Sequence, residues 1–183
     1  MFTALAIIAA VLVYAVIVYN GLVKSRQMVE EAWSGIDVQL KRRADLIPNL
    51  IETVKGYAAH EKSTLEEVIN LRNKAQAVPA GDVAGRAQAE GMLGQALGKL
   101  FALAEAYPDL KANQGFLDLQ ASLETLEGEI QMSRRYYNGA ARDLNVKVES
   151  FPSNLVARNF GFSKASYFEI TNEADRAVPS VKF

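Results

Sequence analysis

His60 and Glu61 form the only fragment of the chain that resembles a catalytic metal motif. In zinc metalloproteases of this type a second histidine stands one helical turn later, so that both imidazoles face the metal. The corresponding position here is Thr64, and His60 is the sole histidine of the chain. We therefore expect His60 to be a structural or surface residue.

The sequence also lacks the residues that other kinds of catalytic site require. The chain has no cysteine, which excludes a thiol nucleophile, a disulfide framework, a thiolate zinc site and an iron–sulfur cluster. Bundle sites for paired iron or manganese use Glu-x-x-His pairs, and Glu124 and Glu127 have helical spacing without any such pair in the sequence. No serine, histidine and aspartate stand at a spacing that marks a triad. We expect no catalytic, cofactor-binding or metal-binding residues and a protein that is not an enzyme; a hydrolase or metal enzyme is the alternative.

Charge composition limits the partners in a similar way. Twenty basic and 21 acidic side chains give a net charge of −1, which argues against a nucleic-acid binder. The run Lys41-Arg42-Arg43 could bind phosphates or anionic lipid headgroups, although Asp37 and Lys41 also have the spacing of an ordinary surface ion pair. No small-molecule substrate is indicated, and the lipid bilayer is the first expected partner.

The bilayer is expected because residues 2–23 carry no charge, and only Thr3, Asn20 and Gly21 among them are not hydrophobic. A helix of this length spans roughly 33 Å, enough to cross a hydrocarbon core of about 30 Å. A cleaved signal peptide is the alternative, but no basic side chain precedes the run and no Ala-x-Ala stands before Lys24. We predict that residues 1–23 are a retained transmembrane anchor.

Basic residues gather on one side of this anchor. Lys24 and Arg26 follow it, whereas no basic side chain precedes it. The positive-inside rule then predicts a single-pass protein with its N-terminus outside and its main domain in the cytoplasm. An extracytoplasmic domain is the alternative orientation.

Beyond the anchor the sequence predicts an all-α bundle over residues 24–170 and a flexible tail over 171–183. Heptads that begin at Trp33 and Ile36 predict a first long helix that continues from the anchor to about Val78, with a kink at Pro48. A turn at residues 79–82 leads, with Asp82 as N-cap, into a second helix that stops at Pro108.

The third long helix begins at Asp109 or Asn113, either of which could cap it, and is ended by Pro152. A short fourth helix over residues 153–160 has Gly161 as its C′ residue. The expected architecture is thus an antiparallel bundle of three long helices and a short fourth.

Polar residues interrupt the apolar seams of these helices. Arg43 falls on a seam of the first helix and needs a partner, for which Asp118, Glu129 and Asp143 of the third helix are the candidates. Tyr137, Asn138 and Asn145 lie along the seam of the third helix, where hydrogen-bonded amides and hydroxyls would fix the register of the bundle.

The chain closely resembles the LemA family. The stretches that carry the resemblance are IDVQLKRR at 36–43, LIPNL at 46–50, VKGY at 54–57, HE at 60–61, FALAEAYPDLKAN at 101–113, YN at 137–138, FPSN at 151–154 and FGF at 160–162. These stretches add Pro48, Asn49, Tyr57 and Pro152 to the structural or interaction candidates. The sequence departs from the family at Leu144, where a tyrosine often precedes Asn145, and residues 78–90 carry no family signal.

The resemblance implies a single-pass bacterial membrane protein with a helical-bundle domain and no established enzymatic activity or ligand residues. Some relatives are associated with magnetosome membranes, and others are linked to a zinc-dependent membrane protease. We therefore expect a membrane-anchored, non-enzymatic scaffold or adaptor that self-associates, because three long seams and one short helix leave apolar surface to cover. A regulator of membrane-protein quality control, with a membrane zinc protease as partner, and a membrane-shaping protein are the alternatives.

Overall fold

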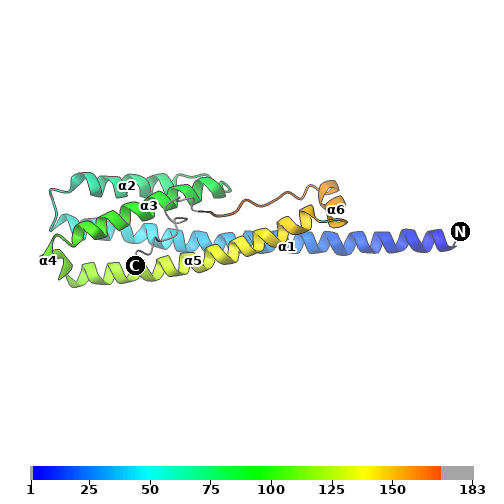
Figure 1. Cartoon of the computed structure of the whole chain (residues 1–183), viewed down its shortest axis with the longest axis horizontal. Helices are drawn as coiled ribbons and strands as arrows, with labels where there is room; N and C mark the ends of the chain where they lie inside the picture. The colour runs from blue at the N-terminus through cyan, green and yellow to red at the C-terminus, as the bar shows by residue number, and fades with distance from the viewer. Residues whose placement is uncertain (1, 170–183) are drawn as a thin grey trace, which may run out of the picture. The chain divides into compact units, whose positions relative to one another are not determined.

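A computed structural model of the chain describes residues 2–169, and every regular element in that range is a helix. The predicted all-α class with a long N-terminal apolar helix is therefore confirmed, while the tail expected at 171–183 lies outside the described residues. In chain order the helices are α1 (Phe2–Lys55), α2 (Lys62–Gln76), α3 (Val83–Ala104), α4 (Pro108–Lys111), α5 (Gln114–Glu149) and α6 (Ser153–Asn159) (Figure 1).

These helices form two compact units. Within the described residues, unit 1 contains residues 2–38 and 130–167, and unit 2 contains residues 39–129 and 168–169. The long helices α1 and α5 contribute to both units, because each is divided by a unit boundary.

Within unit 2 the prediction of a first helix running to about Val78 is wrong. Helix α1 passes through Pro48 without a break and ends at Lys55, and α2 begins only at Lys62. The break follows Gly56, a weak helix former, and the N–H of Tyr57 donates to the carbonyl of Val54 at 3.0 Å. Helix α2 then returns along α1, since Arg72 Nε donates to the carbonyl oxygen of Ala44 at 2.7 Å.

Unit 2 has one hydrophobic core, to which five helices contribute. Helix α3 packs along α2, and the apolar stripes of α1 and α2 face the same interior. Its largest fully buried side chains are those of Ile47, Leu50, Val54, Leu93, Leu100 and Leu110. Burial of such side chains stabilises a bundle by roughly 1.5–3 kcal/mol each, so this stripe holds the polar residues of unit 2 in place.

Three helix ends follow the predicted capping residues, whereas the prediction that the second helix stops at Pro108 is wrong, because α3 ends at Ala104 and Pro108 begins α4. Asp82 accepts a hydrogen bond from the N–H of Gly85 at 2.8 Å and begins α3, and Asn113 accepts from the N–H of Phe116 at 2.9 Å and begins α5. Gly161 has a φ of +72°, and the N–H of Phe162 donates to the carbonyl of Ala157 at 2.9 Å, which is the hydrogen bond of a Schellman motif. The predicted C′ role of Gly161 is confirmed.

Unit 1 pairs the first part of α1 with the second part of α5 in antiparallel orientation. Trp33 and Tyr137 meet edge-on with ring centroids 5.6 Å apart, and Lys147 Nζ donates to Ser25 Oγ at 2.6 Å. Leu22 and Ser25 are buried by this packing.

The first part of α1, in contrast, is apolar and exposed. Its large side chains from Phe2 to Tyr19 are exposed. An 18-residue window of α1 has a mean hydropathy of 2.6, and none of this window is buried. Within residues 2–169, α1 is the one helix long and apolar enough to cross a membrane.

Candidate functional site

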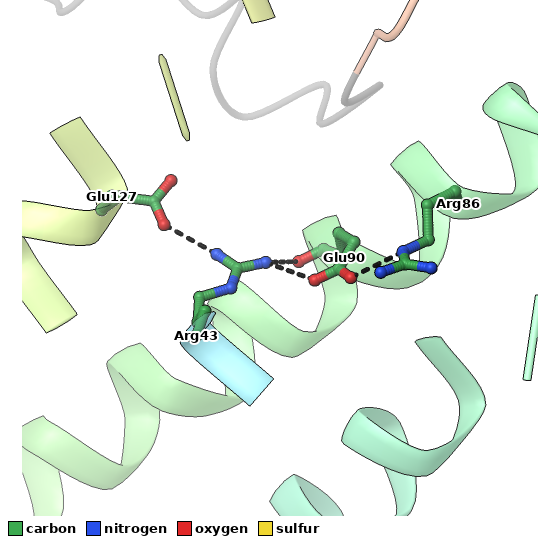
Figure 2. Close-up of polar contacts among 4 residues, drawn as sticks. All are labelled: Arg43, Arg86, Glu90 and Glu127. Atoms are coloured by element: carbon green, nitrogen blue, oxygen red, sulfur yellow. Dashed lines mark hydrogen bonds and ion pairs between the residues drawn. The ribbon is translucent and has the colours of Figure 1, made fainter. Parts of the chain in front are cut away.

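The first group of polar residues inside the bundle surrounds Arg43 of α1 in unit 2 (Figure 2). Arg43 Nη2 lies 2.6 Å from Glu90 Oε2 on α3, and Nη1 lies 2.7 Å from Glu127 Oε2 on α5. Arg86, one turn before Glu90, donates from Nε to Glu90 Oε1 at 2.8 Å. We call Arg43, Arg86, Glu90 and Glu127 the Arg43 cluster.

The Arg43 cluster balances two positive and two negative charges in a water-poor position. Arg43 is 4% exposed and Glu90 is 3% exposed. An isolated charge at such a site would be strongly destabilising, and an arginine donor to each carboxylate oxygen of Glu90 offsets the lost hydration. Arg43 Nη2 also donates to the carbonyl oxygen of Glu90 at 3.3 Å. The cluster therefore ties α1, α3 and α5 together at one level of unit 2.

The sequence predicted the need for a partner to Arg43 and the helix that supplies it, but it indicated the wrong residues. Glu129 pairs with Arg42 at 3.2 Å, Asp118 accepts from Gln114 at 2.8 Å, and Asp143 lies 3.8 Å from Arg142.

Glu90, the most buried partner of Arg43, was missed. Its signal was present, because Glu90 stands three residues before Leu93 and seven before Leu97, on the buried stripe of α3.

The second group of polar residues lies on α5 in unit 1. Asn145 is buried; its Nδ2 donates to the carbonyl of Ala165 at 3.0 Å, and its Oδ1 accepts from the N–H of Ala165 at 2.8 Å. Tyr137, two turns earlier on α5, donates from its hydroxyl to the carbonyl of Ser166 at 2.8 Å. We call Tyr137 and Asn145 the α5 clamp, because they hold the non-helical segment 163–167 along the helix.

The chemistry of the α5 clamp is that of backbone recognition. A side-chain amide that donates to and accepts from one residue satisfies both of its main-chain polar groups, as a neighbouring strand would. Burial raises the pKa of the Tyr137 hydroxyl, which stays protonated and able to donate. The predicted register-fixing role of these two residues thus corresponds to a specific attachment, that of the segment after α6.

The other candidate residues do not join either cluster. Pro48 and Asn49 are exposed on α1, Asn138 is half-buried on α5, and Pro152 is half-buried in the turn before α6. Tyr57 is exposed, and its hydroxyl accepts a hydrogen bond from Asn113 Nδ2 at 3.0 Å. That contact connects the end of α1 to the start of α5.

The His60-Glu61 fragment lies in the turn between α1 and α2. His60 is exposed, and Glu61 Oε1 accepts a hydrogen bond from the hydroxyl of Tyr107 at 3.0 Å. This hydrogen bond, together with burial, raises the pKa of Tyr107. The hydrogen bond thus connects the turn between α1 and α2 to Tyr107, which lies between α3 and α4.

Fold and clusters together define a membrane-associated helical-bundle protein whose internal polar residues bind other parts of the same chain. A sequence profile of the LemA family matches residues 32–183, and the chain belongs to that family.

Named relatives fall into two groups. The magnetosome protein MamQ 2 of Paramagnetospirillum magneticum is 27% identical over an alignment that covers 87% of this chain and 68% of that protein. MamQ of Magnetospirillum gryphiswaldense is 26% identical with the same coverage. Protein LemA of Metamycoplasma hominis is 27% identical over 150 residues, which is 82% of this chain and 68% of the relative.

Proposed function

We propose that this protein is a membrane-anchored, non-enzymatic scaffold of the LemA type, which presents its helical bundle to protein partners and to further copies of itself. Helix α1 crosses the bacterial inner membrane once, with the N-terminus outside and the bundle in the cytoplasm. The basic residues Lys24 and Arg26 at the inner end of the apolar run support this orientation.

The observation that carries the proposal is the use of the internal polar groups. Arg43 forms ion pairs with Glu90 and Glu127. Tyr137 and Asn145 form hydrogen bonds with the backbone of the same chain. Residues in such positions fix one arrangement of helices. A scaffold requires helices that are held in one arrangement, and these contacts provide this within each unit.

A shallow groove between α1 and α5 in unit 1 supports self-association. It encloses about 480 Å³ and is lined by Glu31, Ala32, Gly35, Met132, Ser133 and Tyr136. Met132 and Tyr136 expose more than half of their surface beside the small residues Ala32 and Gly35. Small residues next to large apolar ones allow a second helix to approach closely, and an identical copy offers the matching surface.

Photo-crosslinking in intact membranes tests the scaffold proposal. A benzophenone amino acid at position 136 should give crosslinked species, identified by mass spectrometry as a second copy or another protein. The matched control is the same amino acid at Glu124, an exposed polar position of α5. Absence of any crosslinked species from position 136, together with a strictly monomeric mass in mild detergent, would overturn the proposal.

The alternative of an enzyme has its own test. Bound metal or hydrolytic activity that increases in proportion to the concentration of purified protein would support an enzyme instead.

Orientation can be tested separately, because the chain has no cysteine of its own. A cysteine at the exposed position 60 should react with a membrane-impermeant maleimide in inverted vesicles and be protected in spheroplasts. The opposite pattern would place the bundle outside the cytoplasm.

A further inference from the structure

Helix α6 and the residues that flank it lie against the anchor part of α1. The ring of Phe160 meets that of Tyr19 edge-on with centroids 5.0 Å apart, and the ring of Phe162 lies 5.7 Å from Tyr19. Tyr19 belongs to the uncharged run of α1 and stands five residues before Lys24. The end of α6 is therefore beside a residue of the proposed span, in the same compact unit.

Exposure along α1 fixes the depth of that contact. Side chains of α1 are mostly exposed as far as Asn20, whereas Leu22 is fully buried by protein. From Phe2 to Asn20 a helix rises by about 28 Å, which is close to the thickness of a hydrocarbon core of about 30 Å. Tyr19 thus stands at the inner edge of the hydrocarbon, and its neighbour Phe160 has the same depth.

Three large apolar side chains on this segment expose more than half of their surface. Phe151 is 79% exposed, Leu155 is 55% exposed and Phe160 is 62% exposed. In water such a group of side chains is unfavourable, whereas at the headgroup boundary aromatic rings and leucine are stabilised.

Charge in the segment matches a lipid surface. Residues 151–162 include Arg158 and no aspartate or glutamate, while Lys164 just beyond them pairs with Glu149. The guanidinium of Arg26 lies over the ring of Phe162, 5.2 Å from its centroid, so a cation and an aromatic ring share the level at which α1 leaves the apolar run. Basic and aromatic side chains together are typical of elements that lie in the membrane interface.

We propose that residues 151–162 form a second membrane contact, an interfacial element in which Phe151, Leu155 and Phe160 enter the lipid beside α1. This inference rests on the proposed span of α1. Its occupant is the bilayer itself, since the element is continuous with the exposed apolar surface of the anchor.

The test uses the full chain reconstituted in vesicles of phosphatidylcholine with a minor fraction of phosphatidylglycerol. Single cysteines at positions 151, 155 and 160, each exposed, carry an environment-sensitive NBD label. The matched control is position 117, which is exposed and apolar on α5 and lies about 45 Å along that helix from Lys147, the residue that contacts Gly21. A label at Val13 reports on the span.

We expect labels at 151, 155 and 160 to show severalfold weaker quenching by aqueous iodide than the label at 117, and strong quenching by lipids with a shallow doxyl group. Iodide access equal to that at 117 would overturn the proposal. Protection from iodide without quenching by doxyl lipid would also overturn it, because a protein surface would then cover the element. Loss of lipid quenching at Val13 would refute the span itself and is a separate result. Helical circular dichroism of each labelled protein confirms that it is folded, and the three positions are independent of one another.

Discussion

Asn145 and Ala165 form two hydrogen bonds with each other, although 20 residues separate them in the chain. The amide of Asn145 occupies both the N–H and the carbonyl of Ala165, so the side chain replaces a strand neighbour for one residue. The segment after α6 has no regular structure of its own, and this contact, with that of Tyr137 to Ser166, attaches it to α5.

Asn145→Ala should release that segment. Two hydrogen bonds are lost and the half-buried backbone donor and acceptor of Ala165 are left without them, so we expect a destabilisation of about 1–2 kcal/mol. Hydrogen exchange measured by mass spectrometry should show faster exchange at Ala165 and Ser166 than in the wild type. Asn70→Ala, at an exposed position of α2, is the matched control and should leave this exchange unchanged. Equal protection of Ala165 in both variants would contradict the role of the clamp.

Arg43 and its neighbour Arg42 should differ sharply in their effect on stability. Arg43→Ala leaves the buried Glu90 with Arg86 alone, and we expect a loss of about 3 kcal/mol, at the lower end for a broken buried pair. Arg42 pairs with Glu129 at the surface, so Arg42→Ala should cost less than about 1 kcal/mol. Urea unfolding in mild detergent, followed by circular dichroism, measures both. Similar midpoints for the two variants would show that the Arg43 cluster contributes little to stability.

Asn113 has two functions that substitutions can separate. Asn113→Ala removes the N-cap of α5 and the hydrogen bond to Tyr57, and should cost more than about 1 kcal/mol. Tyr57→Phe removes only the exposed hydrogen bond and should cost about 0.5 kcal/mol. Thermal unfolding of the two variants in the same detergent shows which substitution lowers the stability more. If Tyr57→Phe were the more destabilising change, the contact between the α1 end and α5 would outweigh the cap.

Alkaline pH should weaken unit 1 through Tyr137. Burial raises its pKa above the ordinary value of 10.0, so the folded state keeps this proton when the unfolded chain has lost it. The contribution of Tyr137 is therefore complete below pH 10.0 and is lost as the pH rises through the folded pKa. The difference in tyrosinate absorbance between the wild type and Tyr137→Phe should titrate later than the tyrosines of the urea-unfolded chain. Coincident titration would contradict the burial argument.

The ion pair of Lys164 should also make the folded protein less stable at alkaline pH. Its hydrogen bond and ion pair with Glu149 raise its pKa, so the stabilisation from this pair is complete below the ordinary value of 10.5 and is lost at higher pH. Both groups are exposed, and the effect should be small and sensitive to salt. Glu149→Gln should remove the salt dependence from the alkaline part of the stability profile; an unchanged dependence would show that the pair does not contribute.

Local chemistry in the sequence predicted the helix ends well. Asp82, Asn113 and Gly161 each satisfy a helix terminus through their own atoms or their own φ angle, so the residue type is sufficient. The break after Lys55 was not predicted, because a heptad pattern records which residues face a core and not the direction of the chain. Val54 and Val68 face the same core although one helix runs back along the other.

The partners of the polar residues could be predicted only in part. The heptad repeat places Arg43 on an apolar seam, where its charge needs a partner, so this need follows from the sequence alone. Which carboxylate does so depends on the rotation and level of α3 and α5, and these are set by packing over the whole unit. The attachment of Asn145 to residue 165 had no signal in the sequence, since backbone groups are the same at every position.

Lys147 Nζ donates to the carbonyl of Gly21 at 3.3 Å, within the uncharged run of α1 itself. Helix α1 continues without interruption from this exposed apolar part into the packed part of unit 1. On the proposed span, a bilayer whose thickness does not match the apolar length tilts the helix. The same tilt then changes the orientation of the part of α1 that packs against α5 in unit 1.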